Sequence, residues 1–244
     1  MDTLIILTSA ILPAVALWLF IWKKDPQKEP TGQLLKAVLW GVGICIPVAS
    51  LEMVLDTALF ADGAESYGLV GTTLRAFIVA AIPEESFKLL ALWLVLRRNP
   101  YFDEHFDGIV YAVCVGLGFA AIENVFYLFG ESENWVSVAI ARALLAVPGH
   151  YAFAILMGYY YSIHHFVDRS PKTAACILLV PVLAHGIYDA LALSGTVDPG
   201  IGGLAFLVLI YFCVKMHRRA RTKALALIER DSYSKPTSGQ STTA

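Results

Sequence analysis

Charged side chains are scarce in this sequence of 244 residues. Asp, Glu, Lys and Arg make up 16% of it, and apolar residues make up 57%. A soluble domain carries about 25% charged residues, so this deficit predicts an integral membrane protein and excludes a disordered or collagen-like chain. The 18 basic and 20 acidic residues give a net charge of −2, which is too balanced for binding nucleic acid. We expect no nucleic-acid partner.

Cysteine is also scarce, and the common metal-binding spacings are absent. The four cysteines, Cys45, Cys114, Cys176 and Cys213, stand inside apolar runs, and no CxxC pair or HExxH motif occurs. The spacing excludes a zinc ribbon and a disulfide framework. We interpret the cysteines as small buried apolar residues. The sequence shows no internal repeat and no soluble domain.

Long apolar runs dominate the chain instead. A membrane crossing needs about 20 apolar residues, and seven stretches qualify. They are approximately 3–22, 33–55, 70–96, 107–130, 136–163, 173–194 and 200–216. The first is predicted to be a retained anchor rather than a signal peptide, because Asp2 stands where a basic residue is typical and Lys23 and Lys24 follow the run. The predicted fold is all-α, with about seven transmembrane helices.

The distribution of basic residues predicts an orientation. Of the 18 Lys and Arg residues, 15 fall in alternate connections and the C-terminal segment, and the connections near 56–69, 131–135 and 195–199 hold none. Because basic residues favour the cytoplasmic side, we predict an outside N-terminus and a cytoplasmic C-terminus.

The chain is predicted to have two parts. Residues 1–216 hold the transmembrane helices, and 217–244 form a basic segment and a disordered tail, with disorder expected from 231 onward. The region 215–230 alternates basic and aliphatic residues. It can lie along the anionic inner leaflet, or it can be an ordinary solvated end.

A few titratable residues remain inside the predicted spans, where each charge costs about 2.5–3.5 kcal/mol at mid-bilayer. They are Glu52, Arg75, Glu84, Glu85, Lys88, Glu123, Arg142, His150, His185 and Asp189. At 1.5 Å per residue, Glu84, Glu85, His150 and His185 fall within about 3 Å of mid-helix and Glu123 within about 8 Å. Four helices therefore place titratable groups at nearly one depth, which predicts a shared polar site. We assign no chemistry to Glu52 or Arg75.

The third predicted span carries two adjacent carboxylates after a proline. Pro83 removes a backbone donor and frees an upstream carbonyl. Lys88 stands at i+4 from Glu84 and i+3 from Glu85, so it can pair with either. The carboxylate that Lys88 does not neutralise can act as a general base. The alternative is a structural ion pair.

The fourth and fifth spans add three polar residues. Small residues beside Glu123 and Asn124 allow close helix packing, and Asn124 can donate to an oxyanion or form only an interhelical hydrogen bond. His150 follows Pro148 and Gly149, which predicts an interrupted helix beside protein or a water-filled cavity. A packing role for His150 is the alternative, and Arg142 can neutralise Glu123.

The sixth span places His185 and Asp189 on one helix face at i,i+4. A carboxylate that accepts from one imidazole nitrogen fixes the other nitrogen as a base, a donor or a metal ligand. All of these roles suit a hydrolase.

Together these motifs resemble the PrsW family of intramembrane proteases, within the larger group that contains the CAAX-prenyl proteases. The resemblance rests on EExxK at 84–88, FxxxEN at 119–124, His150, HGxxD at 185–189 and DPxxEP at 25–30, and it covers approximately residues 20–195. CAAX-prenyl proteases usually carry an Arg one position later than Lys88, and this departure favours PrsW. The resemblance implies a multi-pass bacterial membrane protease whose substrates are single-span, membrane-tethered proteins, best known as anti-sigma factors cleaved on their extracytoplasmic side.

The resemblance also implies roles for the site residues. Glu84 and Glu85 would activate water, and Glu123, His150 and His185 would complete the catalytic site, with Lys88, Asn124 and Asp189 in support. His150 or His185 with Asn124 would stabilise the oxyanion. Zinc bound by His150, His185 and Glu123 is an open alternative, because two histidines and a carboxylate leave one coordination position for water.

Two other function classes stay open at this stage. Carboxylates, histidines and interrupted helices at mid-membrane also build proton-coupled transporters and channels, although no matching pair of broken helices occurs in the two halves of the chain. A polar core can equally specify packing in a non-catalytic membrane scaffold or a seven-helix receptor, and this superfamily includes a non-catalytic scaffold subunit.

Overall fold

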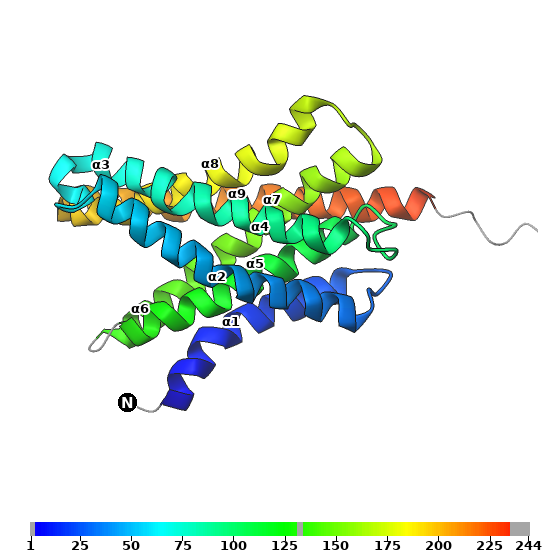
Figure 1. The fold of residues 1–244 in the computed structure, drawn as a ribbon, viewed down its shortest axis with the longest axis horizontal. Coiled ribbons are helices and arrows are strands. Elements are labelled where there is room, and N and C mark those ends of the chain that lie inside the picture. The colour runs from blue at the N-terminus through cyan, green and yellow to red at the C-terminus, as the bar shows by residue number, and fades with distance from the viewer. Residues whose placement is uncertain (1–2, 131–133, 235–244) are drawn as a thin grey trace, which may run out of the picture.

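The computed structural model describes residues 3–130 and 134–234, which form a helical bundle with no strand among them (Figure 1). The helical segments are α1 Thr3–Lys24, α2 Thr31–Leu59, η1 Ala64–Tyr67, α3 Gly68–Arg75, η2 Ala76–Ala81, α4 Ile82–Leu96, α5 Asp107–Gly130, α6 Trp135–Ala141, η3 Arg142–Ala146, α7 Val147–Phe166, α8 Pro171–Leu193, η4 Ser194–Thr196 and α9 Pro199–Ser234. The predicted all-α fold is confirmed.

Seven continuous rods correspond to the seven predicted spans. Six of them are long and apolar enough to cross a membrane among the described residues. The seventh rod joins α3, η2 and α4 over 68–96. It carries four charged residues, Arg75, Glu84, Glu85 and Lys88. A span with that much charge can be stable only where its polar face is buried in protein.

The centre of the bundle is α5, which packs between α1, α2 and α7 and is buried along most of its length. Glycines on α5 permit this close packing. A Cβ on Gly118 would lie 2.4 Å from the Val38 carbonyl oxygen, and one on Gly116 would lie 2.9 Å from the Ala154 side chain. The small residues predicted to allow close approach therefore bring Glu123 next to the neighbouring helices.

Two rods contain a π-helical turn immediately before a site residue. η2 precedes Pro83 and Glu84, and η3 precedes Pro148 and His150. Each proline lacks an N–H group, so the carbonyl four residues earlier loses its α-helical donor, and the wider turn re-pairs the backbone. The predicted interruption at Pro148 is thus a change of helix type, and the chain stays helical through it.

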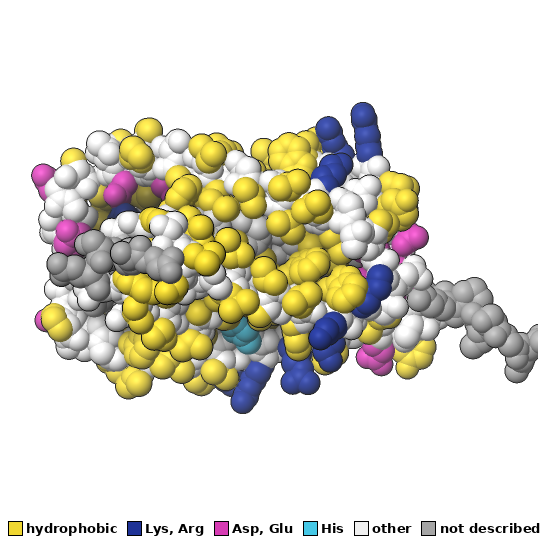
Figure 2. Space-filling model, turned by 90° about the horizontal axis from the view of Figure 1, so that it is seen from below, with side chains coloured by type: hydrophobic (Ala, Val, Ile, Leu, Met, Phe, Trp, Pro, Cys, Tyr) yellow, Lys and Arg dark blue, Asp and Glu magenta, His cyan; other side chains and the backbone are white. Residues whose placement is uncertain are grey.

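The face of the molecule seen in Figure 2 is mostly apolar, and most of its Lys and Arg side chains gather toward the end of the bundle where α9 finishes. We call this the basic end. It holds the α1–α2, α4–α5 and α7–α8 connections and the C-terminal half of α9. An apolar belt with basic residues at one end is the pattern of a multi-pass membrane protein. The direction in which the chain crosses the membrane stays a prediction.

The C-terminal segment differs from expectation. Disorder was predicted from 231 onward, but α9 continues to Ser234. The reason is a long-range cap: the buried carboxylate of Asp231 accepts the backbone N–H groups of His105 and Phe106, both at 2.9 Å, just before α5 begins. The prediction for 231–234 is therefore wrong, and 235–244 lie outside the described residues.

Candidate functional site

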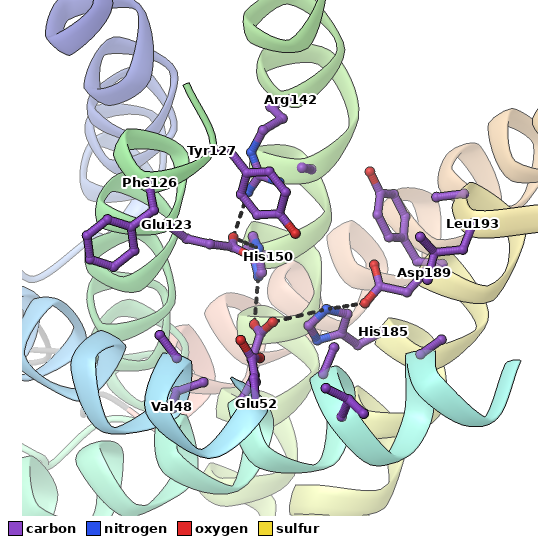
Figure 3. A pocket seen from close by; sticks show the side chains of 18 of the residues that line it. Val48, Glu52, Glu123, Phe126, Tyr127, Arg142, His150, His185, Asp189 and Leu193 are labelled. Carbon is purple, nitrogen blue, oxygen red and sulfur yellow. Dashed lines mark hydrogen bonds and ion pairs between the residues drawn. The ribbon is translucent and has the colours of Figure 1, made fainter. Parts of the chain in front are cut away.

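A cavity of about 800 Å³ opens between α2, the rod formed by α3, η2 and α4, α5, the rod formed by α6, η3 and α7, α8 and α9 (Figure 3). Its acidic, arginine and histidine lining residues are Glu52, Asp56, Arg75, Glu84, Glu123, Arg142, His150, His185 and Asp189. Four of the five predicted catalytic residues line it. Glu85 does not, because its side chain is completely buried behind the wall together with Lys88.

Lys88 joins the two carboxylates of the EExxK motif. Its Nζ donates to Oε2 of Glu84 and Oε1 of Glu85, both at 2.8 Å, and lies 3.1 Å from Nδ1 of His150. The same ammonium sits 4.3 Å from the centre of the Phe119 ring, a cation–π contact. One buried cation therefore pairs with both glutamates, although the sequence alone allowed only one of them to be well neutralised.

His185 is held in place from two sides. Its Nδ1 lies 3.0 Å from Oε1 of Glu85, and its Nε2 lies 3.2 Å from Asp189 Oδ2 and 3.9 Å from Glu84 Oε1. The ring stacks on Phe153 with 4.8 Å between centres. Glu85 thus fixes Nδ1 as the donor and turns Nε2 toward Glu84 and the cavity.

His150 is oriented by the fourth-span glutamate. Its Nε2 lies 2.8 Å from Oε2 of Glu123, and the same oxygen accepts from Arg142 Nη2 at 2.7 Å. Arg142 also packs 3.9 Å from the centre of the Tyr127 ring. The expected neutralisation of Glu123 by Arg142 is present. Arg142 of η3 therefore holds Glu123 of α5, and Glu123 in turn orients the His150 ring.

Asn124 points away from the cavity. Its Nδ2 donates to the Ala10 carbonyl oxygen of α1 at 3.1 Å, and its Oδ1 accepts from Arg142 Nε. This placement favours the interhelical hydrogen bond over donation to an oxyanion, with Asn124 setting the position of Arg142. The sequence left both readings open.

The DPxxEP segment lies away from this cavity, between α1 and α2 at the basic end. Glu29 accepts a hydrogen bond from the Tyr111 hydroxyl of α5, and Asp25 Oδ1 accepts from the backbone N–H of Gln27 at 3.0 Å. Burial raises the pKa of both the Asp25 and the Glu29 carboxyl groups. The segment fastens the α1–α2 connection to the central helix.

Comparison with known proteins agrees with this geometry. The model of the PrsW family intramembrane metalloproteases matches residues 29–216, a range that includes every residue of the cavity. The chain belongs to this PrsW family. It is therefore a protease by family and a multi-pass protein of a bacterial membrane.

Curated relatives extend the PrsW match over most of the chain. Protease PrsW of Clostridioides difficile is 36% identical over 185 residues, covering 74% of this chain and 76% of the relative. Protease PrsW of Geobacillus kaustophilus is 33% identical over 219 residues, with 88% and 92% covered. Protease PrsW of Bacillus subtilis is 33% identical over 222 residues, with 89% and 96% covered. No solved structure matches the chain significantly.

The description of PrsW proteins as metalloproteases raises the question of which residues here can hold an ion. Glu84, His150 and His185 each offer a ligand atom, and these atoms lie within 4.8 Å of one another in a fully buried group. Two imidazoles and one carboxylate match the ligand set of catalytic zinc sites. Each imidazole also has a carboxylate partner on its other side, Glu85 for His185 and Glu123 for His150. The residues fit a metal.

The fit changes the candidate ligand set. Sequence reasoning named His150, His185 and Glu123, whereas Glu84 is the carboxylate that the structure groups with the two histidines. Glu123 stays in contact with His150 and is neutralised by Arg142. We therefore propose Glu84 in its place as the ligand, because helix rotation turns Glu84 and not Glu123 toward both rings.

Two cavity features were not assigned any chemistry from the sequence. Arg75 forms an ion pair with Asp56 at 2.6 Å, with both side chains partly exposed. Glu52 of α2 lies in the cavity wall, and Figure 3 shows it extending toward His150. The signal that could have identified Glu52 was its position, because a carboxylate inside an apolar span is functional by default. The absence of a bonding partner, which the sequence does not show, separates it from a packing residue.

Proposed function

We propose that this PrsW family member hydrolyses a peptide bond in a single-span, membrane-tethered protein, with an anti-sigma factor as the substrate class. The observation that carries the proposal is the convergence of Glu84, His150 and His185 within 4.8 Å in a cavity of about 800 Å³. A cavity of this size with a polar lining can admit water, the one reactant of hydrolysis that the bilayer excludes.

The chain's own residues have distinct parts in this proposal. Glu84 faces the cavity, and its Oε1 has His185 Nε2 at 3.9 Å, so it is the member of the glutamate pair that can reach water or substrate. Glu85 orients His185 from behind, and Glu123 orients His150. Lys88 donates to both EExxK carboxylates and offsets their negative charge inside the bundle.

A metal ion, with zinc as our candidate, would be held by Glu84, His150 and His185. When bound, such an ion polarises a substrate carbonyl and makes a bound water acidic enough to attack near neutral pH. Both rings are held in place for this role. His150 keeps Nε2 on Glu123 and directs Nδ1 toward Lys88 and Glu84. His185 keeps Nδ1 on Glu85 and directs Nε2 toward Asp189 and Glu84.

The shape of the bundle supports a membrane-tethered substrate. At the end opposite the basic end, α6 and α3 spread apart in Figure 1, and the cavity reaches Gly130 and Leu193 near the last residues of α5 and α8. Exposed apolar residues at the cavity edge, including Met53 and Phe206, suit contact with an apolar segment. With the predicted orientation, cleavage would occur toward the extracytoplasmic side, where anti-sigma factors are cut.

The test is cleavage of a purified single-span substrate by the protein in liposomes. Wild type is expected to release a soluble fragment, and Glu84→Gln is expected to lower its rate by about 10²–10⁴-fold with unchanged protein levels. Glu65→Gln, which removes an exposed acid of η1, is the matched control. Full activity of Glu84→Gln would contradict the proposal. Proton-coupled solute uptake lost in the same variant, without any cleavage by wild type, would favour the transporter class instead.

A further inference from the structure

Glu52 differs from every other acidic residue of the cavity. Glu84 is bonded to Lys88, Glu123 to Arg142 and His150, Asp189 to His185, and Asp56 to Arg75. Glu52 forms no hydrogen bond or ion pair with any described residue, and its Oε1 is buried without a partner. A carboxylate inside a membrane bundle normally has a partner, so this one needs an explanation.

The surroundings of Glu52 make its isolation costly. The carboxylates of Glu84 and Glu123 repel Glu52, and the ammonium of Lys88 attracts it. Lys88 is already bonded to both Glu84 and Glu85. A structural role would be served better by Gln or an apolar residue, because neither repels the two acids.

The position of Glu52 fits a reacting group. Figure 3 shows its side chain rising from α2 toward His150, with His185 beside it, on the face opposite Arg142. The carboxylates of Glu85 and Glu123 have their hydrogen-bonding capacity directed to Lys88, His185, His150 and Arg142. Glu84 is bonded to Lys88 and is also one of the three proposed metal ligands. Glu52 is thus the one cavity carboxylate among the described residues for which neither oxygen has a hydrogen bond or an ion pair.

We propose that Glu52 is a further catalytic residue, the carboxylate that carries protons during peptide hydrolysis; this rests on the proposed function. Glu52 takes one proton from the attacking water, whose oxygen bonds to the substrate carbonyl carbon. It then gives that proton to the amide nitrogen as the C–N bond breaks. The products are one carboxylic acid end and one amine end, and Glu52 returns to the carboxylate. No oxidant or other co-reactant is needed.

The experiment compares Glu52→Gln and Glu52→Asp with wild type in the liposome cleavage assay, together with metal content and thermal unfolding in detergent. Glu52→Gln keeps the size of the side chain but cannot exchange a proton. We expect its kcat to fall by about 10²–10⁴-fold, with KM and bound metal unchanged and an unfolding temperature equal to or above that of wild type. Glu52→Asp should recover part of kcat. Asp62→Asn, which removes an exposed acid after α2, is the matched control.

Three results would overturn the assignment. A kcat of Glu52→Gln within about threefold of wild type would exclude proton transfer by Glu52. A parallel loss of metal and activity would make Glu52 a ligand. Lower unfolding temperatures in both variants, with activity falling in proportion, would make it structural. Glu84→Gln measured alongside separates the two proposals: if it is inactive while Glu52→Gln is active, only the role of Glu52 fails, and if Glu84→Gln is active, the proposed function fails.

Discussion

Oε1 of Glu85 lies 3.0 Å from Nδ1 of His185, a hydrogen bond that spans 100 positions of sequence and joins α4 to α8 behind the cavity. The same oxygen lies 2.8 Å from Lys88 Nζ. Two neighbouring glutamates therefore have different surroundings: Glu84 faces the cavity, and Glu85 is enclosed by protein. The difference follows from the 100° rotation between successive helical residues.

Replacing Glu85 should affect stability more than replacing Glu84. Glu85→Ala removes close bonds to both Lys88 and His185, at 2.8 and 3.0 Å. Glu84→Ala removes one close bond, to Lys88, and only longer ion pairs to His185 and His150, at 3.9 and 4.0 Å. Breaking a buried ion pair costs about 3–5 kcal/mol, so Glu85→Ala should unfold at a clearly lower temperature. A released His185 should also weaken metal binding about 10–100-fold. Thermal unfolding and metal titration in detergent measure both effects. Equal unfolding temperatures for the two variants would show that Glu85 is not the structural member of the pair.

Removal of metal should abolish cleavage. A chelator-treated sample is expected to lose activity and to regain it when zinc is restored. His150→Ala and His185→Ala should each lower bound metal about tenfold or more, because each removes one of three ligands. His164→Ala, which removes a histidine near the basic end of α7, should retain it. Elemental analysis of the purified variants measures the ion. Activity that survives complete chelation, with no metal detected in wild type, would exclude a metal centre.

Asp231 should stabilise the bundle without affecting catalysis. Asp231→Ala removes the acceptor for the N–H groups of His105 and Phe106, and the loss of such a cap costs about 1–2 kcal/mol. We expect faster tryptic cleavage within the C-terminal half of α9 and an unchanged kcat. Glu229→Ala, which removes an exposed acid of the same helix, serves for comparison. If Asp231→Ala resists trypsin as well as wild type does, the cap does not hold α9 in place.

Glu29 should make stability depend on pH. Its pKa is raised by burial, so the folded state binds the proton more tightly than the unfolded state does. Wild type should therefore lose stability as pH rises above about 4.3, the ordinary glutamate value, until the raised folded pKa is passed. Glu29→Gln keeps an acceptor for Tyr111 and lacks this loss. The difference in unfolding temperature between Glu29→Gln and wild type should grow with pH over this window. A difference that stays constant or shrinks would contradict the raised pKa.

The fold and the set of site residues could be predicted because membrane helices leave few alternatives. Apolar length sets the spans, and the cost of buried charge forces Glu84, His150 and His185 to meet. The three basic residues left in the spans, Arg75, Lys88 and Arg142, are each paired with an acid as this cost requires. Spacing along single helices was therefore enough to identify most of the cavity.

The rotation of each helix about its own axis could not be predicted. It decides that Asn124 faces Ala10 rather than the cavity, and that Glu84 rather than Glu123 joins the histidines. Those orientations come from packing against α1, α2 and α7, which residue spacing does not encode. For the same reason, the sequence did not reveal the role proposed for Glu52, which is distinguished by a buried oxygen without a hydrogen-bond partner. The length of α9 depended on a cap from residues more than 120 positions away.

The wider turns η2 and η3 affect which parts of their two rods can accept amino-acid substitutions while the site is kept. Each turn inserts an additional residue between an outer half-helix and an inner one that carries a site residue, Glu84 or His150. As a result, the side chains of α3 are rotated about the helix axis relative to those of α4, and the same holds for α6 relative to α7. The outer half-helices can present new side chains to a substrate while the inner halves keep the catalytic groups in register.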